Sequence, residues 1–291
     1  MIAFGTSIAE PEAYHRYSQP GIRLAAEADS EVYAFAAVAS ICRSYNLLLD
    51  AAAKRDDLEA LVVVHPHTEI VDPQFCAKVR EAMCDPEVGV VGCAGASGVR
   101  SIAWWEGAVT AAPIVQRYPE FGGGDLPAFD WAQPAAPPAE VDTVAGLLLV
   151  LSPWVVRNVR FDEALRMNHG YDLDFCRQVR TGGRKAVVAD LRVVNHQSVE
   201  LVKDLNLWIE AHMQLAEKWD ARPADWKQRA RRAEAEREAA RAVTHANSLA
   251  AGARIAALER VVSEVTDSRS WRATRPLREL NRLRQRRRAS S

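Results

Sequence analysis

The sequence lacks paired cysteines and long hydrophobic runs, and these absences exclude several classes of protein. Without a CxxC pair, neither a disulfide framework nor a cysteine zinc site is expected. The longest apolar run, residues 144–151 extended to 156, is well below the ~20 residues of a membrane-spanning helix. The opening residues do not have the pattern of a signal peptide. We therefore expect reduced, mostly buried thiols in a cytoplasmic protein. The five scattered cysteines are Cys42, Cys76, Cys84, Cys93 and Cys176.

Glycine and proline are also scarce, at 15 and 14 of 291 residues. Together with 48% apolar and 26% charged residues, these numbers exclude collagen-like and wholly disordered chains. The length favours one large α/β domain with an appendage, and two domains of equal size are the second choice.

The net charge of −1 hides an asymmetry along the chain. Residues 221–291 contain 18 Arg and Lys against 8 Asp and Glu, which leaves 19 against 30 in residues 1–220. The two parts therefore differ by about 20 charges and have different electrostatic partners.

Short apolar runs alternate with amphipathic stretches over residues 1–200, which predicts α/β structure with a doubly wound, mostly parallel sheet. Residues 101–138 are rich in Trp, Gly and Pro and are expected to form a long loop. The expected strands are 2–4, 32–38, 61–64, 88–93, 141–151, 185–189 and 193–194. The expected helices are 41–53, 74–83 and 172–180.

A C-terminal helical extension follows this sheet. Residues 200–219 are expected to form an amphipathic helix, and Pro223 marks a boundary. Residues 224–265 are rich in Ala, Arg and Glu at helical spacing, which indicates a long helix that either dimerises as a coiled coil or remains solitary. The last 24 residues, 268–291, combine Trp271 and three leucines with nine arginines, a pattern typical of a basic amphipathic helix. The predicted domains are 1–220, 221–267 and 268–291.

The first candidate site is the sequence His65-Pro66-His67-Thr68-Glu69, which follows a buried strand and is expected to form a polar loop. Open α/β sheets bind ligands at the carboxyl ends of their strands. Two imidazoles and a carboxylate are accepted ligands of divalent metals. The alternative is a solvated turn without chemistry.

The second candidate site is the sequence that begins at His169 and contains Asp172 and Asp174. Two acids at positions i and i+2 cannot share one face of a helix, so we expect different roles for them. The alternative is that both only stabilise the helix N-terminus. His196 follows a further strand and is expected at the same edge of the sheet as His67 and Asp172.

Trp104 and Trp105 lie next to Glu106 in the expected long loop. Flat aromatic faces beside a carboxylate suit the apolar faces and hydroxyl groups of a sugar. Packing of both indoles in the core is an equally good interpretation.

The order of these sequences resembles that of bacterial GT-A glycosyltransferases, and most of all the glycosyltransferase family 2-like proteins of polysaccharide assembly. The resemblance covers residues 1–200, and its most specific part is the string from His169 to Cys176. The motif around Trp271 in the tail is similar to one behind helices in many polysaccharide glycosyltransferases. The matching segments are 40–46, 65–70, 144–146, 161–163, 169–176 and 196.

The resemblance implies a GT-A-like fold and inverting transfer of a sugar from a nucleotide diphosphate sugar. It places the catalytic base on Asp172 and the metal ligands on His67, Glu69 and His196. The donor-binding residues implied are Thr6, Ser7, Ser40, His65 and His67. The acceptor-binding residues implied are Trp104, Trp105, Gly146 and Asp174.

This sequence departs from the family at the metal-binding position, where His67 replaces the usual Asp and the carboxylate follows as Glu69. Mn²⁺ accepts imidazole and carboxylate together, whereas Mg²⁺ prefers oxygen, so Mn²⁺ is the expected cofactor. A metal-free, arginine-assisted or inactive site remains an alternative. Tyr171 stands where many relatives have an acid, and Ala145 replaces a frequent Asp.

The leading hypothesis is a glycosyltransferase that acts on a cell-envelope glycan or a lipid-linked acceptor. The alternative is a degenerate GT-A-like domain that binds a glycan or nucleotide, or scaffolds partners. Nucleic-acid binding is not expected, because no recognised motif surrounds the tail arginines and residues 1–220 are acidic. The tail instead predicts peripheral attachment to the anionic inner face of the plasma membrane, and the long helix is the expected site of any homodimer contact.

Overall fold

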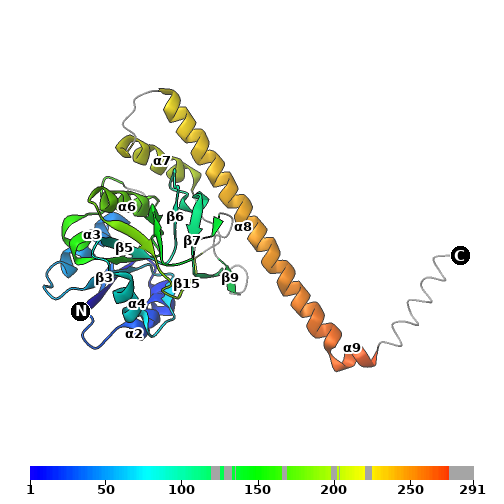
Figure 1. The fold of residues 1–291 in the computed structure, drawn as a ribbon. Coiled ribbons are helices and arrows are strands. Elements are labelled where there is room, and N and C mark those ends of the chain that lie inside the picture. Colours follow the sequence, from blue (N-terminus) through cyan, green and yellow to red (C-terminus); the bar gives the residue numbers. More distant parts are fainter. Residues whose placement is uncertain are drawn as a thin grey trace. The chain divides into compact units, whose positions relative to one another are not determined.

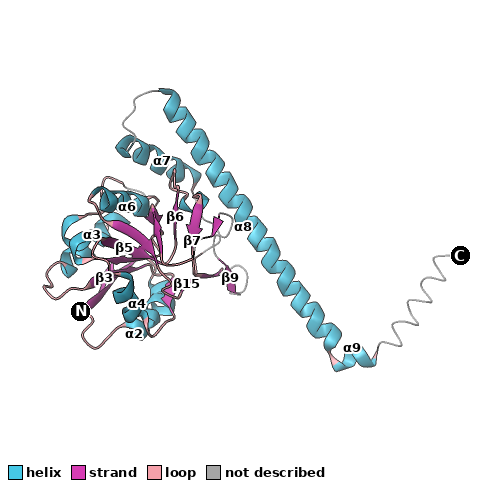
Figure 2. Ribbon diagram, viewed as in Figure 1, coloured by secondary structure: helices cyan, strands magenta, loops and turns pink. Residues whose placement is uncertain are grey.

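The computed structural model describes most of the chain (Figures 1 and 2). The described residues are 1–118, 125–127, 133–134, 136–165, 169–197, 202, 204–219 and 225–274. The chain forms two compact units, Met1–Val243 and Thr244–Ser291. The predicted domain boundaries at residues 220 and 267 describe parts of the chain that fold independently. This division into compact units does not test them, and they stay predictions.

A central sheet forms the core of the first unit. Among the described residues, seven strands take part, in the order β11-β14-β5-β13-β3-β1-β2. β1, β2, β3, β5 and β14 run in one direction, whereas β11 and β13 run in the other. The expected mostly parallel sheet is therefore confirmed. The strands are β1 (Ile2–Ile8), β2 (Val32–Ala36), β3 (Ala60–Val64), β5 (Val88–Gly92), β11 (Ala139–Val141), β13 (Leu148–Leu151) and β14 (Lys185–Val188).

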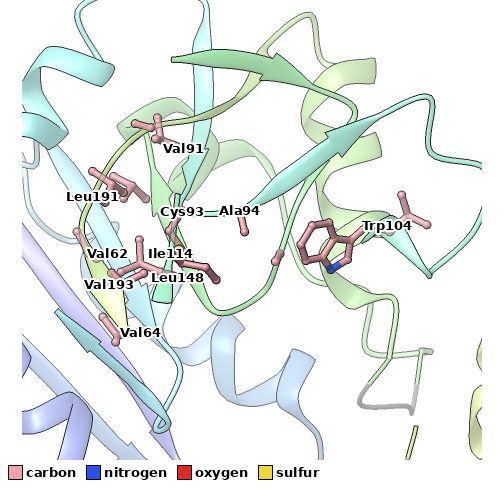
Figure 3. Close-up of a cluster of buried hydrophobic side chains, with 14 of the residues drawn as sticks. Val62, Val64, Val91, Cys93, Ala94, Trp104, Ile114, Leu148, Leu191 and Val193 are labelled. Atoms are coloured by element: carbon pink, nitrogen blue, oxygen red, sulfur yellow. The ribbon is translucent and has the colours of Figure 1, made fainter. Parts of the chain in front are cut away.

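Helices cover both faces of this sheet, as the doubly wound prediction requires. Because side chains alternate along a strand, Val62 and Val64 of β3 face one hydrophobic cluster with α2 (Gln19–Ala25) and α4 (Phe75–Ala82). Leu61 and Val63 face a second cluster with α3 (Ile41–Ala52) and α5 (Pro153–Asn158). α6 (Tyr171–Thr181) contributes to both. Figure 3 shows the first cluster around Val62, Val64 and Leu148.

The expected long loop contains short regular elements that the sequence did not predict. They are the 3₁₀ helix η2 (Trp104–Glu106) and the strands β7 (Val109–Ala111), β8 (Val115–Arg117), β9 (Asp125–Pro127) and β10 (Gln133–Pro134). These strands join two small sheets, β10-β7-β6-β12 and β4-β15-β8-β9. The other members are β4 (Thr68–Ile70), β6 (Gly95–Ser97), β12 (Thr143–Val144) and β15 (Val193–Asn195). Strands this short form only because a distant partner pairs with them.

The N-terminal helical segment was also not predicted. It consists of α1 (Pro11–Ala13), the π-helical turn η1 (Tyr14–Ser18) and α2. This segment follows the end of β1 directly and packs against β4. It therefore borders the turn that contains the first candidate site.

The expected C-terminal helices are α7 (Leu205–Trp219), α8 (Asp225–Asp267) and α9 (Arg269–Ala273). Within the first unit, Trp208 Nε1 donates to Ala235 O at 3.2 Å, and His212 Nε2 lies 3.0 Å from Glu238 Oε2. These contacts join α7 to the beginning of α8. The rest of the predicted basic tail, residues 275–291, lies outside the described residues. In the part of the chain that is described, none of the helices is both long and apolar enough for a membrane crossing.

Candidate active site

The first candidate site lies at the end of β3, as predicted, but only part of it is a loop. The turn of His65 and His67 leads directly into β4, and β4 pairs antiparallel with β15 so that Glu69 lies opposite Val194. The expectation that Glu69 lies in a polar loop is therefore wrong. Pairing with β15 also brings His196 to this turn, because His196 N donates to His67 O at 2.9 Å.

The side chains at this turn form imidazole–carboxylate pairs. His196 Nε2 lies 2.7 Å from Glu69 Oε2, and His67 Nε2 lies 3.1 Å from Glu10 Oε2. The ring of Tyr17 stacks on the imidazole of His196 at a centroid distance of 3.8 Å. Burial lowers the pKa of His196, and its contact with Glu69 only partly opposes this effect. His196 is therefore neutral near pH 7, so that its Nε2–H donates to Glu69 and Nδ1 has the lone pair.

These side chains provide two adjacent metal donors, Glu69 and His196. Among the described residues, no three His, Cys, Asp or Glu side chains form a group that could hold a metal ion, and His67 Nε2 is already paired with Glu10. Divalent ions in sites that bind phosphates often use one or two protein ligands, with substrate phosphates completing the shell. The chemistry of Glu69 and His196 fits an ion of that kind.

The second candidate site places Asp172 in the first turn of α6. Gly146 N donates to Asp172 Oδ2 and Leu173 N donates to Oδ1, each at 2.9 Å. Burial raises the pKa of Asp172 in spite of these backbone hydrogen bonds. A carboxylate with a raised pKa is a stronger base, and its fixed orientation suits proton removal.

The loop of Gly146 and Leu147 connects the two candidate sites. Leu147 O accepts hydrogen bonds from His65 N and from Thr68 Oγ1, each at 3.0 Å, while Gly146 N holds Asp172. A Cβ atom on Gly146 would lie only 2.0 Å from the Tyr171 hydroxyl oxygen, so this position requires glycine. The same two-residue segment thus holds both Asp172 and the turn at His65.

The predicted donor-binding residues outside this turn lie within a strand or at the start of a helix. Thr6 and Ser7 are buried in β1, and within the described chain Thr6 Oγ1 has no hydrogen-bond partner. Ser40 Oγ accepts a hydrogen bond from Arg43 N at 3.1 Å and so caps α3. Their contact with a nucleotide stays a prediction.

The predicted acceptor residues are mostly buried. Trp104 and Trp105 belong to the first hydrophobic cluster, and Trp105 packs against Trp208 at a ring distance of 5.8 Å. Asp174 is fully buried and contacts Lys218 Nζ at 2.8 Å and Trp219 Nε1 at 2.7 Å. Asp172 and Asp174 thus have different partners, as their spacing predicts, and Asp174 holds α6 against α7.

Sequence reasoning missed Glu10, Tyr17 and Arg117 at the first site. Arg117 Nη1 lies 4.0 Å from Glu69 Oε2. Tyr17 comes from the unpredicted N-terminal helical segment, Glu10 directly precedes this segment, and Arg117 comes from the short strand β8. No motif or spacing in the sequence relates these residues to His67 or His196.

The fold and these contacts define an α/β protein with imidazole and carboxylate groups gathered at the edge of its sheet. A family model described as "Glycosyltransferase like family" matches residues 4–218. This match covers well over half of the chain, so the chain belongs to this glycosyltransferase-like family. The predicted resemblance to glycosyltransferase family 2-like proteins is thereby confirmed.

A similar curated protein is the streptomycin biosynthesis protein StrF of Streptomyces griseus. It is 28% identical over 202 residues, which are 68% of this chain and 67% of StrF. The aligned region corresponds in size to the glycosyltransferase-like part of this chain.

Two similar solved structures contain nucleotides and manganese. GalNAc-T7 with UDP, GalNAc and Mn²⁺ has a TM-score of 0.49 and 10% identity over 76% of this chain, which spans 48% of that chain. The mannosyltransferase PcManGT of Pyrobaculum calidifontis with GDP-Man and Mn²⁺ has a TM-score of 0.45 and 15% identity, covering 94% of this chain and 81% of that chain. Both TM-scores are below 0.5, so the family assignment does not depend on these likenesses.

Proposed function

We propose that this protein is an inverting glycosyltransferase with Asp172 as its general base. The donor is a nucleotide diphosphate sugar, and the acceptor is a cell-envelope glycan or a lipid-linked molecule. The observation that supports this proposal is the anchored carboxylate of Asp172, with its raised pKa, next to the loop that also holds the turn at His65.

The reaction consists of one displacement. Asp172 removes the proton of the acceptor hydroxyl while that oxygen attacks the anomeric carbon of the sugar. The bond between this carbon and the diphosphate oxygen breaks, and the nucleotide diphosphate leaves with the electron pair. Attack from the face opposite the leaving group inverts the configuration of the sugar.

The leaving diphosphate requires positive charge near its oxygens. A divalent ion held by Glu69 and His196 would supply this charge as a Lewis acid, and Mn²⁺ suits the mixed imidazole and carboxylate donors better than Mg²⁺. Arg117 lies beside Glu69 and adds a fixed positive charge to the same region.

The test is release of nucleotide diphosphate from nucleotide sugars in the presence of Mn²⁺. Asp172→Asn keeps the size of the side chain but removes the base, so release should fall about 100-fold or more. Asp190→Asn changes an exposed aspartate and should leave release unchanged. Undiminished release by Asp172→Asn would remove this residue from the mechanism.

A second candidate function is binding without turnover. It is favoured by the histidines that pair with carboxylates where relatives have an acidic motif. A protein of this kind binds a nucleotide or glycan but releases no nucleotide diphosphate from any donor. Calorimetric binding together with an absence of product would therefore select this function.

We further propose two contacts for the C-terminal part of the chain, on the inner face of the plasma membrane. The long helix α8 pairs with a second copy of itself, and the basic residues 268–291 bind anionic lipid. The exposed apolar side chains of α8 and the nine arginines of the tail support these contacts.

A further inference from the structure

A cavity lies between α6, α7 and the beginning of α8, on the side of α6 that faces away from the second hydrophobic cluster. It has a volume of about 240 Å³, and all of its lining residues belong to the first unit. Its basic lining residues are Arg100, Arg177, Arg231 and His212, and no aspartate or glutamate of the described chain lines it.

Arg177 has no carboxylate partner within ion-pair distance in the described part of the chain. Its guanidinium lies 5.9 Å from the ring centroid of Trp219. The nearby carboxylate of Asp174 is already bound by Lys218 and Trp219. Burial lowers the pKa of Arg177, and the negative charge of Asp174 opposes this effect only in part. Two of the other basic residues already have carboxylate partners, since Arg231 pairs with Glu234 at 2.7 Å and His212 lies 3.0 Å from Glu238. The half-buried charge of Arg177 is therefore the poorly compensated one, and an anion would be stabilised beside it.

The cavity is close to the proposed base. Leu173, which lines it, follows Asp172 directly, and Arg177 lies about 7.5 Å further along the axis of α6 at 1.5 Å per residue. Ile102 and Leu215 of the cavity wall also pack against Gly170, the residue before α6. A molecule that extends along α6 from Asp172 can therefore reach the cavity.

We propose that this cavity binds a phosphate group carried by the acceptor, remote from the hydroxyl group that attacks. Guanidinium groups bind phosphate oxygens through paired hydrogen bonds, and those of Arg177 and Arg100 line this cavity without a carboxylate partner in the described chain. A phosphate monoester carries nearly two negative charges at pH 7 and so matches two guanidinium groups better than the single charge of a carboxylate. The apolar wall of Leu173, Leu215 and Trp219 accommodates the part of the acceptor next to this phosphate. The inference rests on the proposed function, because it names the class of acceptor for that reaction.

The test is calorimetric binding of phenyl phosphate to the full chain in the presence of saturating UDP and GDP, which occupy the donor site. Arg177→Gln and Arg100→Gln should each weaken binding about tenfold, since each removes a charge-assisted contact. Arg184→Gln is the matched control, because Arg184 also lies over a tryptophan, Trp154, but outside the cavity. Unchanged binding by both cavity variants would overturn the proposal, as would benzoate that binds as tightly as phenyl phosphate.

Two further measurements separate this inference from the proposed function. Asp172→Asn should bind phenyl phosphate normally while releasing no nucleotide diphosphate, so each property can fail alone. Dodecyl phosphate in micelles should bind more tightly than phenyl phosphate if the phosphate belongs to a lipid, and equally if it belongs to a soluble ester. Either result supports a phosphate site. If Arg184→Gln lost the binding of both ligands while Arg177→Gln and Arg100→Gln kept it, the phosphate would not bind in this cavity.

Discussion

At the scale of single residues, the partners of a carboxylate decide its chemistry. In the described part of the chain, the carboxylate of Asp172 accepts hydrogen bonds from two backbone N–H groups and from no side chain, and burial raises its pKa. Asp174 lies two residues further along the chain. Its carboxylate pairs with Lys218 and accepts hydrogen bonds from Trp219 and Gln178. Only Asp172 therefore combines an anchored orientation with a free capacity to accept a proton.

The raised pKa of Asp172 predicts the acid limb of the pH profile. The base must be ionised, so kcat/KM should fall as pH decreases through a pKa above the ordinary aspartate value of 3.8. Asp172→Glu should retain some activity and move this limb, whereas Asp190→Glu should not. Measurement of kcat/KM against pH, with circular dichroism to exclude unfolding, checks the prediction. A limb at the same pH in Asp172→Glu would assign it to another group.

The donors Glu69 and His196 predict that metal binding depends on the nucleotide. Titration calorimetry should detect weak binding of Mn²⁺ alone and tighter binding with UDP or GDP, because phosphate oxygens complete the shell. Glu69→Gln and His196→Ala should each weaken the binding with nucleotide about tenfold. The exposed His15 provides the control His15→Ala. Tight binding of Mn²⁺ without nucleotide would contradict a site of two protein donors.

At the scale of elements, the small apolar side chains of α8 are buried in the first unit, whereas larger ones are exposed in the second. In the first unit, Ala235, Ala239 and Ala242 are buried. In the second unit, apolar side chains at spacings of three and four residues are 46–59% exposed: Ile255, Leu258, Val262 and Val265. This spacing is the a/d pattern of a coiled coil, and Arg254 and Glu259 occupy flanking positions of opposite charge.

This pattern predicts a parallel dimer through the second half of α8. Leu258→Glu combined with Val262→Glu places like charges in the contact and should convert dimers to monomers in sedimentation equilibrium. Ala256→Glu changes an exposed position next to the stripe and should leave the dimer intact. A monomeric wild-type protein at high concentration would instead indicate a solitary helix.

Helices and strands were predicted where their own residues show a periodic pattern. They were missed where they form only by pairing with a distant segment. The helix of α6 follows from its apolar periodicity, and the structure places it at Tyr171–Thr181. β4 contains only three residues, and its pairing with β15 joins positions more than 120 residues apart. No local pattern reports such a contact, so Glu69 was expected in a loop.

At the scale of the whole molecule, the opposite charges of the two parts of the chain predict where it binds. Residues 268–291 contain nine arginines with interspersed apolar side chains, and each arginine near an anionic surface contributes about 1 kcal/mol. The full chain should sediment with vesicles that contain phosphatidylglycerol at low salt. Truncation after Asp267 should abolish this, and vesicles of phosphatidylcholine alone should bind neither form. Equal sedimentation of the truncated chain would refute the role of the tail.

The sequence by itself determined the fold class, the family resemblance and the positions of Asp172 and the turn at His65, because strand and helix periodicity and the order of motifs are local properties. Only the tertiary structure decided what each side chain contacts. It buried Trp104, Trp105 and Asp174, brought Glu10 and Tyr17 to the histidines, and enclosed three arginines in one cavity. Those outcomes depend on packing between segments far apart in the chain, which residue spacing does not encode.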